Sequence, residues 1–282
     1  MAEQKKRTIG IIGAGPAGMS AAWDLAGAGH DVTIYEAESR PGGLAGGFKD
    51  EDYPVIEQWA RSLGGPLLDL ACGTGRMALH LASSGYPVTG VDIVPEMIAH
   101  ARRKAAERAV TIDWVVADAR AFHLDKQSPF IFMLMNAFQF LLTRADHEAM
   151  LARVREHLLP GGYFLFETRN PSPRNLLQTR SAEPQQFTTP DGRQLVVTEQ
   201  QHYDPMTQIQ HYTSDYQWFH PGDQRAAQEK RLRVALRYVY PQEMEALLYY
   251  NGFRIETCYG SWRQEPLTAD SPAMIYVCQR RV

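Results

Sequence analysis

The fold of this chain is decided by the stretch Leu67-Leu68-Asp69-Leu70-Ala71-Cys72-Gly73-Thr74-Gly75-Arg76. An apolar run ends there in a glycine-containing loop that opens a helical segment, and the next apolar segment, Val88–Asp92, ends in an acid. Strands that alternate with helices in this way predict a parallel sheet covered by helices. The stretch therefore predicts an α/β, Rossmann-like doubly wound sheet whose ligands bind beyond the carboxyl ends of the strands.

The same alternation continues outward to about residue 168. The predicted strands are Leu67–Ala71, Val88–Asp92, Ile112–Val116, Phe130–Met135 and Gly162–Thr168, and the predicted helices are Arg76–Ser84, Pro95–Glu107 and Ala145–Leu158. The apolar run from Phe130 to Leu142 is well short of the roughly 20 residues that cross a bilayer. We interpret it as a buried strand, and Pro160-Gly161-Gly162 as the stop signal of the preceding helix.

The pattern changes between residues 171 and 240. Period-2 segments at Leu195–Tyr203, Ile209–Phe219 and Lys230–Tyr238 are separated by turn signals, which predicts an antiparallel β-rich insertion. Its tyrosines and tryptophan form either one packed face of a sheet or a pocket wall. A helix (Gln242–Tyr250) and two strands (Phe253–Gly260 and Met274–Gln279) are expected to close the chain.

The first 50 residues hold 10 of the 22 glycines and carry a second signature. Gly13, Gly15 and Gly18 follow the apolar run Ile9–Ile12, and Glu36 ends the next one, Val32–Tyr35. This is the dinucleotide fingerprint, in which the glycines admit a tight turn, a pyrophosphate and a closely packed helix, and the acid binds ribose. We expect a β-α-β fragment over residues 1–50 and a second domain over residues 51–282.

Composition excludes several classes of protein. With 44% hydrophobic and 22% charged residues, the chain resembles a soluble globular protein. A net charge of -3 gives no general electrostatic case for nucleic acid or anionic lipid. Three cysteines without metal-ligand spacing indicate a reducing compartment and no metal site. We expect a cytoplasmic protein with no nucleic-acid or membrane partner, and its oligomeric state stays open.

The glycine loop and the segments that follow it resemble class I S-adenosylmethionine-dependent methyltransferases. The resemblance covers about residues 51–282, and we identify only the family. It implies that S-adenosylmethionine binds to residues of the loop and of the following strand ends, with Asp92 on the ribose hydroxyls and Asp118 near adenine. The positions concerned are Asp69, Gly73, Gly75, Asp92, Ile93, Met97, Asp118 and Ala119.

Residues 8–53 resemble the N-terminus of FAD-dependent amine oxidase and protoporphyrinogen oxidase-like flavoproteins. In those families the segment equivalent to Arg40-Pro41-Gly42-Gly43 also touches the flavin nucleotide. The rest of such a flavoprotein has no counterpart downstream, so we expect the fragment not to hold FAD stoichiometrically. Whether it binds any nucleotide, or is a structural remnant, stays open at this point.

Methyl transfer from a sulfonium is an in-line displacement that depends mainly on holding the reactants in position. Asn136 follows the fourth strand and is expected near the reacting methyl, or else caps local backbone. His211 is a candidate general base by its intrinsic pKa. The expected acceptor is a small molecule.

The methyltransferase family usually places closing helices before its first strand. Here the flavoprotein-like fragment stands in their place, and only Tyr53–Leu63 resembles the last of those helices. The leading hypothesis is thus a methyltransferase whose usual N-terminal lid is replaced. The alternatives are an FAD- or NAD-dependent oxidoreductase and a non-catalytic fusion of two Rossmann pieces.

Overall fold

The computed structural model describes residues 8–12, 31–35, 51–172, 176, 180–181, 183–188, 192–220, 222–223 and 225–281. The chain forms two compact units, which we treat one at a time. The smaller comprises Met1–Lys49 with Pro173–Ala235, and the larger comprises Asp50–Ser172 with Leu236–Val282. No helix among the described residues is long and apolar enough to cross a membrane.

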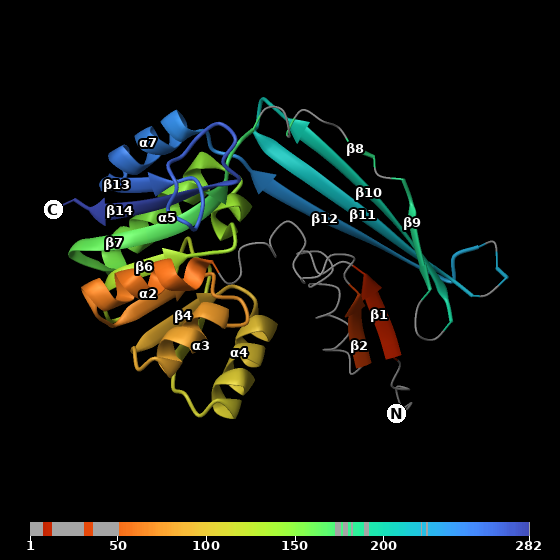
Figure 1. Ribbon diagram of the computed structural model, residues 1–282, viewed down its shortest axis with the longest axis horizontal. Coiled ribbons are helices and arrows are strands. Elements are labelled where there is room, and N and C mark those ends of the chain that lie inside the picture. Colours follow the sequence, from red (N-terminus) through yellow and green to blue (C-terminus); the bar gives the residue numbers. More distant parts are fainter. Residues whose placement is uncertain are drawn as a thin grey trace. The chain divides into compact units, whose positions relative to one another are not determined.

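The larger unit is built on a seven-stranded sheet (Figure 1). In spatial order its strands are β13 (Phe253–Tyr259), β14 (Ala273–Arg280), β7 (Leu158–Arg169), β6 (Ser128–Met133), β3 (Leu67–Leu70), β4 (Val88–Asp92) and β5 (Asp113–Val116). The strands from β7 to β5 are parallel, whereas β14 runs antiparallel to both of its neighbours. The predicted doubly wound sheet is confirmed, and its order reverses between β3 and β6, where ligands bind in such folds.

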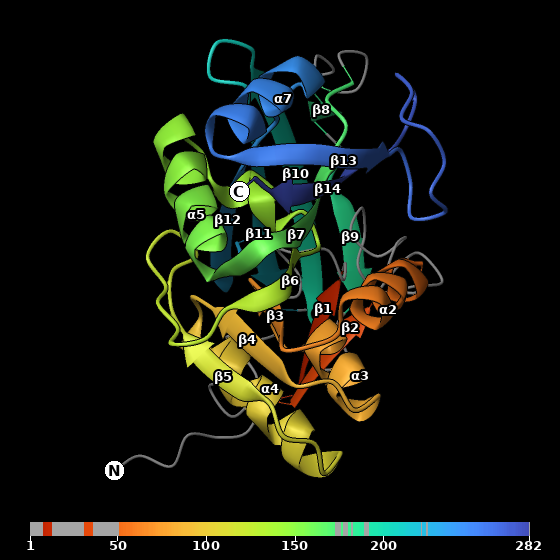
Figure 2. The same cartoon turned by 90° about the vertical axis from the view of Figure 1, so that its left-hand side faces the viewer.

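Five α-helices cover this sheet. They are α2 (Asp52–Leu63), α3 (Arg76–Ser83), α4 (Pro95–Glu107), α5 (Arg144–His157) and α7 (Pro241–Tyr250). Figure 2 shows α2 and α5 on opposite faces of β6 and β7. Local sequence sets where α5 begins, because Thr143 and Asp146 form a reciprocal capping box. Similarly, Pro95 opens α4 with a φ already suited to a helix.

The composition of the run from Phe130 to Leu142 predicted a single buried strand, but the run contains more than one element. β6 ends at Met133, and Ala137–Phe140 form the 3-10 helix η2. The physical reason is that Met135 and Asn136 both have a φ of 57°, which turns the chain out of the sheet. Pro160-Gly161-Gly162 likewise lie inside β7, at an irregularity in its pairing with β6, and α5 ends before them at His157.

The core of the larger unit is aromatic. Phe138 stacks on Phe166 with ring centroids 4.6 Å apart, and Phe166 also stacks on Phe164 and Tyr276. All four side chains are fully buried. Because Phe138 belongs to η2, this stack fixes the segment after β6 against the middle of the sheet.

Two sheets are described in the smaller unit. β1 (Thr8–Ile12) pairs parallel with β2 (Asp31–Tyr35), as predicted for a β-α-β fragment. The other sheet has the order β12 (Gln228–Arg237), β11 (Ile209–Phe219), β10 (Gln194–Asp204) and β8 (Arg180–Ser181), and β9 (Gln185–Thr188) also pairs with β10. β10, β11 and β12 correspond to the three predicted strands, whereas β8 and β9 were not predicted. One face of this sheet buries Leu195, Val197, Tyr216 and Trp218 as a packed cluster.

Candidate functional site

The loop after β3 has the backbone that a close-fitting ligand site requires. Ala71, Gly73 and Gly75 all have a positive φ. The loop is held by the N–H of Cys72 on the carbonyl oxygen of Val91 (3.0 Å) and by the N–H of Gly75 on that of Cys72 (2.9 Å). A Cβ placed on Gly73 would meet no described atom within 4 Å. The space beside Gly73 is therefore open to a ligand.

Gly75 is needed for a different reason. A Cβ there would lie 2.4 Å from Trp114 Cη2, and a Cβ on Gly90 of β4 would lie 2.4 Å from Trp114 Cζ3. Real Cβ atoms do not approach so closely, so the Trp114 ring occupies the room that both glycines leave. The sequence identified Gly75 but not its aromatic neighbour.

Asp92 ties the glycine loop to the end of β4. Its Oδ2 accepts the N–H of Gly73 at 2.7 Å, and its Oδ1 accepts the N–H of Val94 at 2.9 Å. The residue is only 9% exposed. A carboxylate has about four lone-pair sites, so each oxygen keeps capacity for a further donor such as a hydroxyl.

Apolar side chains lie open beside this acid. Ile93 is 58% exposed and Val116, which ends β5, is 46% exposed. Met97, in the first turn of α4, is half-buried. Exposed apolar side chains next to an acid that can accept hydroxyl donors are suited to binding a flat heterocycle, because such a ligand packs on apolar surface and is oriented by a few polar contacts.

Asp69 lies beneath the loop and is buried. Its Oδ2 accepts the N–H of Ala78 in α3 at 3.2 Å. Burial raises the pKa of Asp69 to about 8, although Arg76 acts in the opposite direction. Asp69 is thus mostly protonated at neutral pH, and its visible contact is with protein backbone.

A partly buried ion pair joins α2 to α3. Both nitrogens of the Arg76 guanidinium fork donate to the Asp52 carboxylate, Nη1 to Oδ1 at 2.9 Å, and Asp52 is 1% exposed. The guanidinium carbon also lies 4.8 Å from the centre of the Tyr53 ring. The helix predicted at Tyr53–Leu63 is therefore present as α2 and anchored beside the glycine loop. The sequence did not indicate this pairing.

The corner after β6 carries the candidate catalytic residue Asn136. It is 7% exposed, and its N–H donates to Glu167 Oε1 at 3.3 Å. Left-handed backbone costs a non-glycine residue roughly 1–2 kcal/mol, and the corner contains two such residues in succession. The sequence analysis missed Glu167. An acid that directly follows the apolar run Phe164–Phe166 in a predicted buried strand was the signal that could have identified it.

Asp118 and Ala119 follow β5 at the same edge of the sheet. The Asp118 carboxylate accepts hydrogen bonds from the backbone N–H of Arg120 at 2.8 Å and from its Nη2 at 2.6 Å. The Arg120 side chain holds the pKa of Asp118 below its usual range. Arg120 also pairs with Asp146 of α5. Asp118 is therefore already committed to a cation on the protein.

The remaining predicted residues belong to the smaller unit or lie outside the described residues. His211 is exposed on β11 in the smaller unit, directly opposite His202 of β10. Gly13, Gly15, Gly18, Glu36 and Arg40 lie outside the described residues. The larger unit thus brings together only the residues around the glycine loop, the ends of β4 and β5, and the Asn136 corner.

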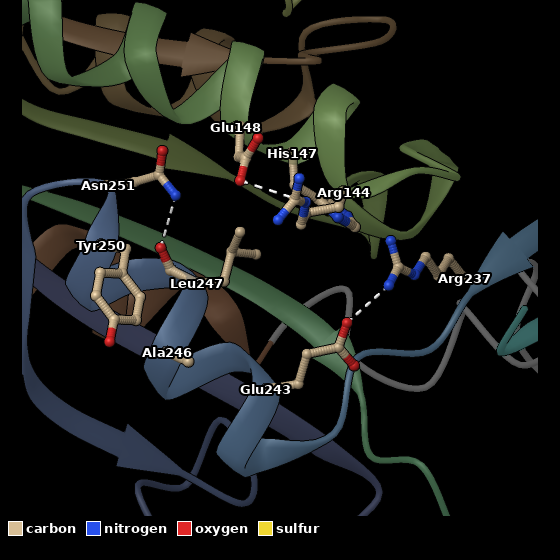
Figure 3. A pocket seen from close by; sticks show the side chains of 9 residues that line it. All are labelled: Arg144, His147, Glu148, Arg237, Glu243, Ala246, Leu247, Tyr250 and Asn251. Carbon is tan, nitrogen blue, oxygen red and sulfur yellow. Dashed lines mark hydrogen bonds and ion pairs between the residues drawn. The ribbon is translucent and has the colours of Figure 1, made fainter.

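A pocket of about 200 Å³ lies between α5 and α7 (Figure 3). Figure 3 shows that its arginines are paired with acids, Arg144 with Glu148 and Arg237 with Glu243. His147 lines the pocket from α5 and stacks on Phe138. Burial, aided by Arg237, lowers the pKa of His147 to about 4. The sequence did not predict this pocket, and its paired charges leave it without a clear ligand preference.

Two families match parts of the chain. Residues 67–162 match the family described as methyltransferase domain, and residues 11–61 match the NAD(P)-binding Rossmann-like domain. Both matches agree with the signatures read from the sequence. The Rossmann-like match continues through most of α2.

Similar proteins include methyltransferases with varied acceptors. Cypemycin N-terminal methyltransferase of Streptomyces is 26% identical over 77% of this chain and 84% of its own length. Ubiquinone biosynthesis O-methyltransferase of Pectobacterium atrosepticum is 33% identical over 41% of this chain and 47% of its own length. The chain spans about half the length of the first curated relatives it matches.

Solved structures share the fold. The CcbJ methyltransferase from Streptomyces caelestis has a TM-score of 0.69 at 22% identity, covering 86% of this chain and 94% of its own. An S-adenosylmethionine-dependent methyltransferase from Clostridium acetobutylicum has a TM-score of 0.68 at 15% identity, covering 83% and 92%. The larger unit therefore has the fold of class I methyltransferases.

Proposed function

We propose that this chain, which carries a class I methyltransferase domain, transfers a methyl group from S-adenosylmethionine to a small-molecule acceptor. The observation that carries the proposal is the link from Asp92 to Gly73 at 2.7 Å. It connects Asp92, whose carboxylate can accept further hydrogen bonds, to a loop with unoccupied space beside Gly73. A ribose and the methionine portion attached to it need these two features side by side.

The proposed cofactor contacts follow from this arrangement. Asp92 accepts the ribose hydroxyls, and the backbone at Gly73 lies against the methionine portion. Ile93 and Met97 offer apolar surface to adenine, and Asp118 and Ala119 border it. Asp69 and Gly75 act from below, by holding α3 and by leaving room for Trp114.

The chemistry requires little beyond positioning. A sulfonium carries its own leaving group, so rate comes mainly from aligning the acceptor atom behind the methyl carbon. We propose that Asn136 orients the acceptor. His211 remains our candidate general base, and residues 171–240 our candidate for the segment that sets acceptor choice.

A parallel calorimetric titration tests the proposal. The protein is titrated with S-adenosylmethionine, S-adenosylhomocysteine, FAD and NAD under identical conditions. We expect binding of the first two at one site per chain. Equal absence of binding for both would refute the proposal.

The acceptor is then sought by transfer of a radiolabelled methyl group. The names of the relatives suggest three acceptor classes for the panel: a nucleotide-linked amino sugar, a phenol of the quinone type and a peptide α-amine. We expect label in one class well above the others. Uniform background across the panel in a protein that binds S-adenosylmethionine would favour a non-catalytic fusion.

A second candidate function is a flavin- or nicotinamide-dependent oxidoreductase. It is favoured by the Rossmann-like match over residues 11–61 and by the parallel pairing of β1 with β2. We propose that this N-terminal fragment, residues 1–50, is a structural element that does not retain FAD. A yellow protein that keeps near-stoichiometric flavin absorbance after dialysis would reverse the order of the two candidates.

A further inference from the structure

The corner after β6 needs external support. Met135 and Asn136 are consecutive, neither is glycine, and both have a φ of 57°. Residues in sparsely populated conformations persist only where the surrounding structure over-determines them, and they gather at binding and catalytic sites.

Glu167 supports this corner. Its Oε1 accepts the N–H of Asn136 at 3.3 Å. Its Oε2 accepts the indole N–H of Trp262 at 2.8 Å. Trp262 lies in the segment between β13 and β14. One side chain at the end of β7 thus joins the loops that follow two other strands.

The chemistry of these contacts selects a carboxylate. Both donors are N–H groups, and an ionised carboxylate offers about four lone-pair sites and no competing donor, whereas an amide has one oxygen and an NH₂. Glu167 is 2% exposed. Burial, with the nearby negative charge of Asp52 as a smaller cause, raises the pKa of Glu167 to about 7. A buried acid is kept here against its desolvation cost.

We propose that Glu167 is a positioning residue for methyl transfer, which fixes the Met135–Asn136 corner so that Asn136 is held in register with the acceptor. This inference rests on the proposed function. Glu167 need not touch S-adenosylmethionine, because its effect passes through the backbone of Asn136. Its loss therefore affects the rate of transfer and leaves cofactor affinity intact.

The first test is the variant Glu167→Gln, which keeps the size of the side chain but turns an NH₂ group toward N–H donors. With the acceptor found in the panel above, we expect kcat to fall at least tenfold. The Kd for S-adenosylhomocysteine and the KM for S-adenosylmethionine should stay within threefold of the wild type. Asp270→Asn is the matched control, since Asp270 is an exposed acid in the same segment as Trp262.

The second test is Trp262→Phe, which removes a single N–H and keeps an aromatic ring. We expect a fall in kcat of about threefold to tenfold, again at constant cofactor affinity. The control is Trp59→Phe, because Trp59 packs on Phe130 and Tyr163 toward the other end of the sheet. This variant should retain wild-type kcat.

A third readout needs no acceptor. In protein labelled with ¹⁵N-asparagine, the backbone amide of Asn136, assigned through Asn136→Ala, should exchange its proton at least tenfold faster in Glu167→Gln. Unchanged exchange, unchanged kcat, or a loss of cofactor affinity that parallels the loss of kcat would each overturn the inference. A wild-type protein that binds no S-adenosylhomocysteine would instead refute the proposed function, and the Asn136 amide would still decide whether Glu167 holds the corner.

Discussion

The Nε2 of Gln139 donates to the carbonyl oxygen of Arg237 at 3.2 Å, across 98 residues of sequence. Its Oε1 accepts the N–H of Arg169 at 3.4 Å. Gln139 is fully buried. The chain leaves the larger unit after Ser172 and re-enters it at Leu236. The Gln139 amide therefore hydrogen-bonds to backbone near both of these points, at Arg169 and at Arg237.

We expect Gln139→Leu to destabilise the larger unit. The substitution removes both hydrogen bonds of a fully buried side chain, and such bonds typically contribute about 0.5–1.5 kcal/mol each. Urea unfolding followed by circular dichroism measures the change. Gln127→Leu is the control, because the Gln127 amide bonds to backbone at an exposed position and surface changes usually stay within about 0.5 kcal/mol. Equal stability of the two variants would show that Gln139 is dispensable.

The same link predicts that the insertion is removable. Residues 173–235 can be replaced by a short glycine–serine linker, since Arg169 and Arg237 both bond to Gln139. We expect the shortened protein to fold and to bind S-adenosylmethionine, and to lose its acceptor preference. Calorimetry and the acceptor panel provide the measurements. Retention of both turnover and preference would reduce the insertion to a packing or assembly element.

Asp92→Ala should weaken binding of S-adenosylmethionine. Hydrogen bonds to a charged acceptor contribute about 1.5–3 kcal/mol, which corresponds to a loss of affinity of roughly tenfold to 150-fold. Part of the loss comes from the glycine loop, whose Gly73 N–H also loses its partner. Asp113→Ala, at the exposed start of β5, is the control and should bind as the wild type does. Unchanged affinity in Asp92→Ala would remove the ribose assignment.

Gly90→Ala tests the contact with Trp114. The new methyl group would overlap the ring, and overpacking of this kind costs about 1–3 kcal/mol. A double-mutant cycle with Trp114→Leu should show that most of this cost disappears when the ring is absent. Thermal unfolding gives the four stabilities. Strict additivity of the two substitutions would contradict the predicted overlap.

Asp69 makes the stability of the protein depend on pH. Its folded-state pKa, about 8, lies above the unfolded value, so between roughly pH 4 and pH 8 the folded state binds the extra proton. The contribution of Asp69 to the free energy of unfolding should therefore fall as the pH rises through this range, by on the order of a few kcal/mol. Asp69→Asn, which keeps an oxygen for Ala78, should flatten the profile. The exposed acid variant Asp125→Asn should keep the wild-type profile, and an Asp69→Asn profile with the same slope as the wild type would contradict the prediction.

Sequence patterns predicted most of the elements because local chemistry decides them. The glycine loop, the proline that opens α4 and the acid that ends β4 are each visible within ten residues of the feature they create. Alternation of apolar and polar residues was equally sufficient for β10 and β11. Their pairing requires only the turn between them.

Long-range partners could not be predicted in this way. The bond from Glu167 to Trp262 joins residues 95 apart, and Arg76 reaches back 24 residues to Asp52. A buried acid is recognisable in sequence only as an exception to an apolar run, and nothing local indicates its partner. The turn after β6 was missed for a related reason, since Met135 shows no sign in sequence of a left-handed backbone.

The placement of Trp114 between Gly75 and Gly90 has an optical consequence. The chain has five tryptophans, and this indole is half-buried against the glycine loop. Its emission should respond to any change in polarity or stacking at that loop, whereas Trp59 and Trp262 pack away from it. In a variant that keeps Trp114 and carries phenylalanine at the other four positions, the intrinsic fluorescence would report ligand binding at the glycine loop without an added label.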